Sequence, residues 1–359
     1  NPSWLFRIIK GPAFHATIFF ILGGFIFTSK FASKAAEFKT FPFLKKRFFE
    51  LYPLHAITTV AMIIILLLHQ IPSGNVNISK LAFSAFMHLS LLWSFFPFNS
   101  YSLNTPSWAL SAFFLCYLLF GPLLKLVAKI NNKRYLFAML VMAFIPLAAW
   151  SIIYRQMGNP PEFYNFFHIF GLIRFFEFVI GMLLARFFQI TTSKPRKESF
   201  LQPILCDCVV IISIVSIFFL LQLHSGKFSS LQFISYHLFL TPFYVIILYT
   251  VATEKGLLAK LFSLPVIRKT GRSSFYPYLI HIPLINIITY TCENFFGYKK
   301  FLHEPLNITL FIVILYGASY IYVNNFRKRK LNIPPTQKEL EKEALKSMAK
   351  SDISNIKKA

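Results

Sequence analysis

The sequence contains few charged residues and few cysteines. Of its 359 residues, 14% are charged, whereas 56% are hydrophobic and 18% are aromatic. This composition is too apolar for an ordinary soluble domain. The four cysteines, at positions 116, 206, 208 and 292, lack the spacing of a zinc site or a disulfide framework, so no metal site is predicted. A glycine-rich phosphate loop after a strand is also absent, and we expect no bound cofactor.

Acidic residues are the scarcer of the two charged classes. The chain has 13 Asp and Glu against 37 Lys and Arg, which gives a formal net charge of +24. In a soluble protein this excess would suggest nucleic acid as a partner. Here the basic residues form short clusters between apolar runs, as they do on the cytoplasmic side of membrane proteins. No aromatic stacking platform accompanies them, so the predicted partner is the lipid bilayer and not nucleic acid.

Long apolar runs recur along the whole chain. A helix needs about 20 such residues to cross a bilayer core of roughly 30 Å, and helices satisfy their own backbone hydrogen bonds in lipid. The sequence therefore predicts an all-α membrane bundle with about nine to ten transmembrane helices. The ten candidate segments are 12–29, 53–71, 81–98, 107–128, 135–154, 166–188, 205–223, 232–252, 273–291 and 306–323.

The basic clusters restrict which of these segments cross the bilayer. They lie at 30–47, 125–134, 186–197, 255–272 and in the tail from Arg327 onward. These clusters lie on one face of the membrane only if one of the ten segments does not cross it. The segment 81–98, which contains His88 and runs into Pro97, is the best candidate for a re-entrant or interfacial position. Nine crossings then place residue 1 opposite the C-terminus, and an upstream helix would bring the count to ten.

The ends of the chain lead to three further expectations. The first residue is Asn1 and no signal peptide precedes the first apolar run, so we expect the chain to begin inside a longer protein. Residues 1–326 are predicted to form the membrane domain, and 327–359 a basic and polar cytoplasmic tail. The predicted location is the inner, cytoplasmic membrane, with several passes and a cytoplasmic C-terminus.

Ionisable residues inside the membrane are costly, so the few that occur are candidate site residues. Arg174 and Glu177 stand three apart on one helical face, either as a structural ion pair or as the lining of a polar cavity. His281 lies inside a predicted helix and is either a hydrogen-bonded structural residue or a general base. Lys46 and Arg47 belong to a basic loop that either anchors the helix or binds phosphate.

Four stretches resemble, in order and spacing, motifs of the acyltransferase type 3 family of membrane O-acyltransferases. FFILGGF is similar to the family's FFxLSGF helix, and FLKKRFFELYPLH to its Arg-x-x-Arg pair before Tyr-Pro. TPSWALSAFFLCYLLFGPLL is similar to its Pro-Ser-Trp-Ser-Leu-Ser-x-Glu helix. The last stretch joins RFFEFVIGMLLAR to GRSSFYPYLIH. The four occupy residues 19–25, 43–55, 105–124, and 174–186 with 271–281.

The resemblance implies transfer of an acyl group, commonly acetyl, from acyl-CoA to a hydroxyl of a cell-envelope glycan or a lipid-linked sugar. It implies that a His acts on the acceptor and that polar donors stabilise the oxyanion of the thioester. Catalytic roles are expected for His281, Arg174 and Glu177. The residues expected to bind substrates are Arg47, Lys46, Trp108, Ser111 and Tyr278.

The chain departs from the family pattern at several positions. Glu50 stands where the second Arg of Arg-x-x-Arg is expected, Ala112 replaces a Glu, and Gly23 replaces a Ser. The family's main catalytic His lies about eleven residues after an Arg on a first helix, which we expect in a segment before Asn1. Two alternatives therefore stay open: a catalytically reduced member that acts by binding, and an unrelated transporter or glycan polymerase. No internal symmetry of the kind found in transporters supports the latter.

Overall fold

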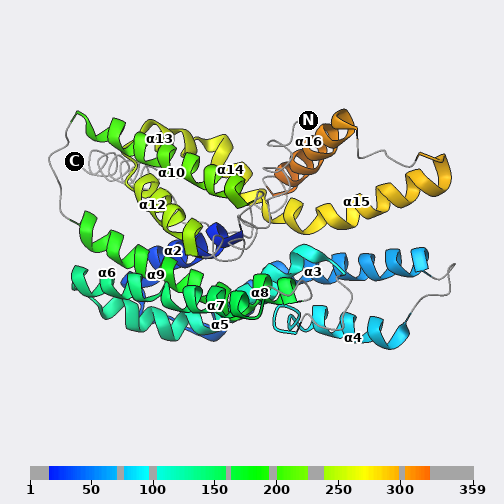
Figure 1. The fold of residues 1–359 in the computed structure, drawn as a ribbon, viewed down its shortest axis with the longest axis horizontal. Coiled ribbons are helices and arrows are strands. Elements are labelled where there is room, and N and C mark those ends of the chain that lie inside the picture. Colours follow the sequence, from blue (N-terminus) through cyan, green and yellow to red (C-terminus); the bar gives the residue numbers. More distant parts are fainter. Residues whose placement is uncertain are drawn as a thin grey trace, which may run out of the picture.

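The structure, a computed structural model, describes residues 16–70, 77–96, 103–158, 163–193, 200–224, 238–298 and 304–323. Within these ranges every regular element is a helix, which confirms the predicted all-α fold class (Figure 1). The predicted tail at 327–359 lies outside the described residues. The helices are α2 (Ala16–Phe31), η2 (Ala32–Lys34), α3 (Thr40–Gln70), α4 (Ile78–Leu89), η4 (Thr105–Ser107), α5 (Trp108–Lys129), α6 (Lys133–Met142), α7 (Ile145–Gln156), α8 (Tyr164–Ile169), α9 (Gly171–Thr192), α10 (Gln202–His224), α12 (Leu240–Ala252), α13 (Leu257–Phe262), α14 (Pro265–Ser273), α15 (Phe275–Phe296) and α16 (Pro305–Ile321).

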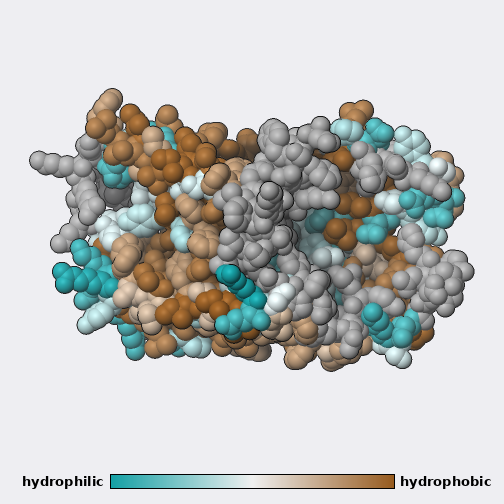
Figure 2. Space-filling model, viewed as in Figure 1, coloured by the Kyte–Doolittle hydropathy of each residue, from teal (hydrophilic) through white to brown (hydrophobic). Residues whose placement is uncertain are grey.

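Several of these helices can cross a bilayer, which confirms a multi-pass membrane bundle. Among the described residues, six helical stretches are long and apolar enough: Ala16–Lys34, Thr40–Leu68, Thr105–Lys129, Lys133–Gln156, Phe166–Thr192 and Gln202–Leu220. The apolar helices α4, α12 and α16 are shorter, and α15 is 22 residues long. The total of nine to ten crossings stays a prediction. Figure 2 shows hydrophobic residues over much of one face of the molecule.

Helix α4 has the length expected of a segment that does not cross the membrane. Its 12 residues extend about 18 Å at 1.5 Å per residue, well short of a bilayer core of roughly 30 Å. A turn follows, in which Leu91 has a φ of 60°. The ring of Trp93 stacks on His88 with centroids 4.3 Å apart. The chain thus folds back directly after α4, and a re-entrant or interfacial position remains the prediction for this segment.

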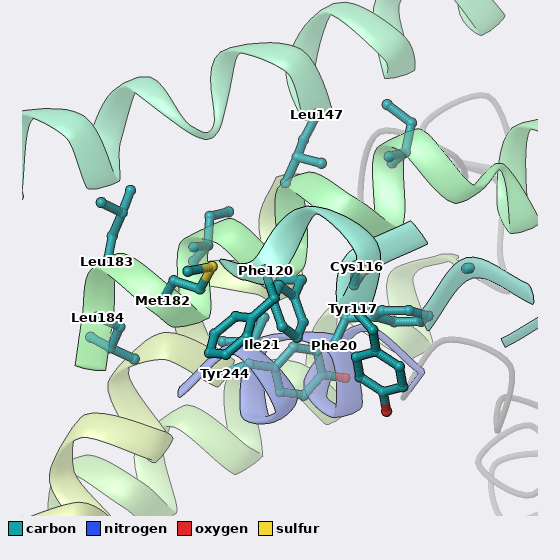
Figure 3. Packing of buried hydrophobic residues seen from close by; sticks show 14 of the residues in the cluster. Phe20, Ile21, Cys116, Tyr117, Phe120, Leu147, Met182, Leu183, Leu184 and Tyr244 are labelled. Atoms are coloured by element: carbon teal, nitrogen blue, oxygen red, sulfur yellow. The ribbon is translucent and has the colours of Figure 1, made fainter. Parts of the chain in front are cut away.

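The centre of the bundle is built on a close crossing of α2 and α9. A Cβ atom at Gly24 would overlap the carbonyl oxygen of Phe178, and one at Gly181 would overlap that of Ile21. Two glycines that face the partner backbone let membrane helices approach closely. Phe20 and Met182 pack beside this crossing in the main hydrophobic cluster (Figure 3). The crossing fixes the start of α2 against the first half of α9, where the polar site lies.

Candidate functional site

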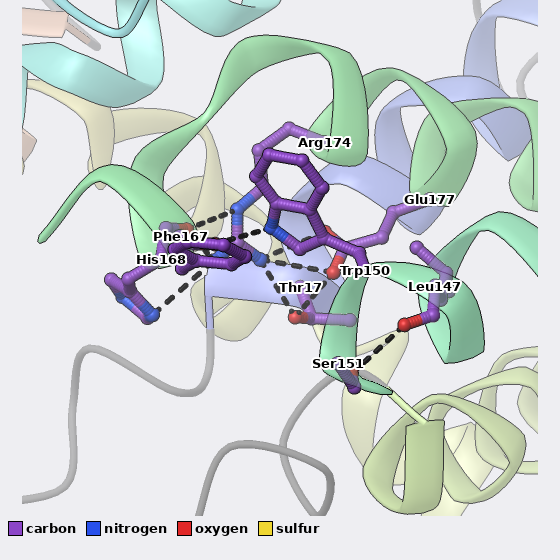
Figure 4. A network of polar contacts seen from close by, with 8 residues as sticks. All are labelled: Thr17, Leu147, Trp150, Ser151, Phe167, His168, Arg174 and Glu177. Carbon is purple, nitrogen blue, oxygen red and sulfur yellow. Dashed lines mark hydrogen bonds and ion pairs between the residues drawn. The ribbon is translucent and has the colours of Figure 1, made fainter. Parts of the chain in front are cut away.

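Arg174 and Glu177 form an ion pair in the interior of the bundle. Arg174 Nη1 lies 2.9 Å from Glu177 Oε1 and 3.0 Å from Oε2, and both residues have 0% of their surface exposed. Thr17, at the start of α2, accepts from Arg174 Nη1 at 3.0 Å and donates to Glu177 Oε1 at 2.9 Å. Figure 4 shows the three side chains converging from α2 and α9. The predicted pairing is therefore present, and Thr17 closes it into a triangle.

The other N–H groups of the Arg174 guanidinium bond to the backbone at the break between α8 and α9. Phe170 has φ −56° and ψ 118°, so helical hydrogen bonding is interrupted there. The backbone carbonyl of His168 accepts from Arg174 Nε at 3.0 Å and also from Nη2. Gly171, at the start of α9, leaves room for the ring of Phe95, since a Cβ atom would lie 2.5 Å from that ring. Arg174 thus replaces backbone donors that a continuous helix would have supplied.

Aromatic rings cover the guanidinium. Its Cζ atom lies 5.1 Å from the ring centroid of Trp108 and 5.9 Å from that of Phe20. A cation over an indole or phenyl face is stabilised by the ring quadrupole. The structure therefore brings together three predicted site residues, Arg174, Glu177 and Trp108. The donors of the guanidinium point to protein acceptors in this arrangement, which favours a positioning role for Arg174.

Ser111 is held by the turn that follows α4. Its hydroxyl lies 2.7 Å from that of Ser94 and donates to the backbone carbonyl of Leu91. It also accepts from the backbone N–H of Ser94 at 3.3 Å. Ser111 lies one helical turn after Trp108 on α5. The residue thus fixes the turn against the helix that carries Trp108.

Tyr278 and Asn104 attach α15 to the start of α5. The Tyr278 hydroxyl donates to the carbonyl of Pro106 at 2.9 Å. Pro283 lies inside α15 and has no N–H to offer to the carbonyl of Leu279, four residues earlier. Asn104 Nδ2 donates to that carbonyl at 3.0 Å and to the Thr58 hydroxyl of α3 at 3.0 Å. Because Pro283 leaves the Leu279 carbonyl without its helical donor, Asn104 can bond to that carbonyl. Asn104 therefore joins α3 and α15 at the start of α5.

His281 projects from α15 one turn after Pro277. Its Nδ1 lies 3.0 Å from the Pro277 carbonyl and must donate to it, since a carbonyl only accepts. The neutral ring then keeps its lone pair on Nε2, the nitrogen that can take a proton from a hydroxyl. The ring is half-buried, with its centroid 6.3 Å from that of Tyr278. His281 therefore lies near the start of α5, where Tyr278 bonds to Pro106, and the observed hydrogen bond of His281 stays within α15.

Lys46 and Arg47, the two basic residues predicted to bind the acyl-CoA donor, differ in environment. Lys46 is exposed, whereas Arg47 is half-buried and pairs with Glu50, with Nη1 and Oε2 2.7 Å apart. The Arg47 guanidinium also lies over the rings of Phe27 and Phe43, at 4.8 and 5.4 Å. Glu50, which stands where the resemblance predicts an Arg, is therefore the direct partner of Arg47. Any phosphate bound here must compete with that carboxylate.

A second polar cluster was not among the site residues predicted from the sequence. His55 Nε2 donates to the carbonyl of His88 at 2.8 Å, and His88 Nδ1 donates to that of Ser84 at 2.8 Å. Both rings are 1% exposed. Both histidines lie in predicted apolar segments, which was the one sequence signal that could have pointed to them. Nothing in the sequence shows that residues 55 and 88 lie close together. Their observed contacts join α3 to α4.

The chain is similar to known proteins over most of its length. The profile of the acyltransferase type 3 family, described as an acyltransferase domain, matches residues 12–323. The chain is 25% identical over 312 residues to the peptidoglycan O-acetyltransferase OatA of Listeria monocytogenes, a match that covers 82% of the chain. It is 29% identical over 181 residues to the acyltransferase MdmB of Streptomyces mycarofaciens, covering 47% of the chain. The matches span 47% and 45% of these two relatives. No solved structure matches the chain.

Proposed function

Because the chain belongs to the acyltransferase type 3 family, we propose that it transfers an acyl group, most simply acetyl, from acyl-CoA to a hydroxyl of a cell-envelope glycan or a lipid-linked sugar. The observation that carries this proposal is the family match over residues 12–323, within which Arg174, Glu177 and Trp108 meet in one buried site. A relative named as an O-acetyltransferase of peptidoglycan supports a glycan acceptor. We place the protein in the cytoplasmic membrane with its C-terminus in the cytoplasm.

The proposed reaction is a direct ester exchange. The acceptor hydroxyl oxygen attacks the thioester carbonyl, the C–S bond breaks, an ester C–O bond forms, and CoA leaves as the thiol. His281 Nε2 takes the hydroxyl proton in this scheme and gives it to the departing sulfur, in addition to any His supplied by a segment before Asn1. In this proposal Trp108, Ser111 and Tyr278 line the path of the substrates. The ion pair of Arg174 and Glu177 keeps the helices that form this path in position. Lys46 and Arg47 receive the phosphates of CoA.

The ion pair between Arg47 and Glu50 favours a second candidate function. A guanidinium already paired at 2.7 Å offers less charge to an anionic donor than a free one. A catalytically reduced member that acts by binding a glycan would tolerate this pair. The two candidates differ in one property, namely whether acyl-CoA is consumed.

Turnover of labelled acetyl-CoA by the full-length protein in detergent tests the proposal. We expect the label to move to a glycan acceptor, or to water when no acceptor is present. Arg47→Ala should raise the KM for acetyl-CoA at least tenfold, because a charge-assisted phosphate contact is worth about 1.5–3 kcal/mol. Lys129→Ala, at the end of α5, is the matched control and should leave KM unchanged. Absence of both acetyl-CoA binding and hydrolysis would support the binding-only alternative.

A further inference from the structure

An apolar groove of about 900 Å³ lies between α3, α15 and α16. Its volume falls within the range of ligand pockets, roughly 300–1,000 Å³. Figure 1 shows α16 beside α15, with α3 on the other side of α15. The side chains that line the body of the groove are apolar and come from all three helices: Pro53, Ile57, Ile280, Leu284, Leu310 and Phe311.

Asn307 lines the groove near the start of α16, and three further polar side chains lie together at its other end. Glu50, Tyr276 and Tyr322 line it there, and the rings of Tyr276 and Tyr322 meet at 5.3 Å. The apolar lining then continues along α15 as far as Ile288, twelve residues from Tyr276. Twelve residues of helix correspond to about 18 Å, comparable to one leaflet of a bilayer core of roughly 30 Å. The groove thus has the length and polarity of one lipid chain with its headgroup at the Tyr276 end.

Helix α14 brings positive charge to that end. It leads directly into α15, packs against α16, and carries Arg268, Lys269 and Arg272 with no acidic residue. Arg268 Nε is buried and has no hydrogen-bond acceptor among the described residues. Val266, also on α14, is 67% exposed. An amphipathic helix with basic residues and an exposed apolar face is suited to the interface of a membrane that contains anionic lipid.

We propose that the groove is a binding site for one hydrocarbon chain of an anionic glycerophospholipid, whose phosphate lies against the cations of α14. The three cations of α14 favour this occupant over a purely apolar protein segment, because such a segment carries no negative charge to pair with them. The site is separate from the Arg174–Glu177 pair, and its occupancy does not depend on the proposed acyl transfer.

Native mass spectrometry of the full-length protein tests the site. Protein stripped of lipid in detergent is offered phosphatidylglycerol or phosphatidylcholine. We expect one retained phosphatidylglycerol per chain, with at least a fivefold preference over phosphatidylcholine. Leu284→Trp, which fills the groove, and Arg268→Gln, which removes a headgroup cation, should each lower that retention at least fivefold. The controls Ile312→Trp, at an exposed position of α16 outside the groove, and Lys260→Gln on α13 should retain the lipid.

Three outcomes would overturn the proposal. These are equal retention of the two phospholipids, retention unaffected by Leu284→Trp, and retention of an added polyprenyl phosphate in preference to phosphatidylglycerol. Ala318→Trp fills the same groove from α16 and serves if Leu284→Trp does not elute as a single folded species. Because no acyl donor is present, the result is independent of whether the protein turns over acetyl-CoA.

Discussion

Glu177→Gln is expected to destabilise the protein by about 3–5 kcal/mol, because it leaves the Arg174 charge buried without its counter-charge. Both side chains are fully buried, so water cannot replace the lost partner without opening the bundle. Arg174→Met should have an effect of similar size, since it leaves the carboxylate of Glu177 uncompensated. Thermal unfolding of the protein in detergent, followed by tryptophan fluorescence and by the monodisperse fraction, measures both effects.

The double variant Arg174→Met, Glu177→Leu distinguishes the buried charge from simple loss of packing. Replacing a whole buried ion pair by apolar residues of similar volume is often neutral or stabilising. We therefore expect the double variant to unfold at a higher temperature than either single variant. A double variant as unstable as the sum of the two single changes would show that the pair contributes through packing and not through charge.

His281→Gln is expected to lower kcat by about 10²- to 10⁴-fold, the usual effect of losing a general base, with a small change in KM. Gln keeps a donor near the Pro277 carbonyl but has no basic nitrogen. Because the ring is half-buried and its observed hydrogen bond stays within α15, thermal unfolding should change little. Steady-state turnover of acetyl-CoA by the full-length protein, with acceptor present, gives both kinetic constants.

Asn294→Ala is the matched control for His281. It lies on the same helix, is exposed, and donates only to its own helix, to the Tyr290 carbonyl at 2.9 Å. This variant should leave both kinetic constants unchanged. Unchanged turnover in His281→Gln would remove His281 from the site.

The features that sequence analysis predicted well depend on local spacing. Residues 174 and 177 are one turn apart, so a helix through both predicts their contact. Basic clusters, together with His88 and Pro97, identified 81–98 as the segment least suited to cross; α4, which overlaps it, is short, and its failure to cross stays a prediction. Apolar runs of sufficient length predicted the membrane bundle itself.

The features that sequence analysis missed depend on contacts between distant parts of the chain. Thr17 joins Glu177 across 160 positions, and Asn104 joins the Leu279 carbonyl across 175. The His168 carbonyl becomes available only because the chain breaks between α8 and α9, and no residue type signals that acceptor. Glu50 looked like a lost cation, yet it is the partner of Arg47. Helix packing, which pattern analysis does not provide, decides each of these contacts.

The proposed transfer requires an acyl donor to approach from the face on which the basic clusters gather. Single cysteines at Lys46 and Arg272, in a protein whose four native cysteines are replaced, can be labelled in sealed vesicles with a reagent that does not cross the membrane. The account predicts that both positions react from the same side, the one that corresponds to the cytoplasm. Labelling of the two positions from opposite sides would contradict it.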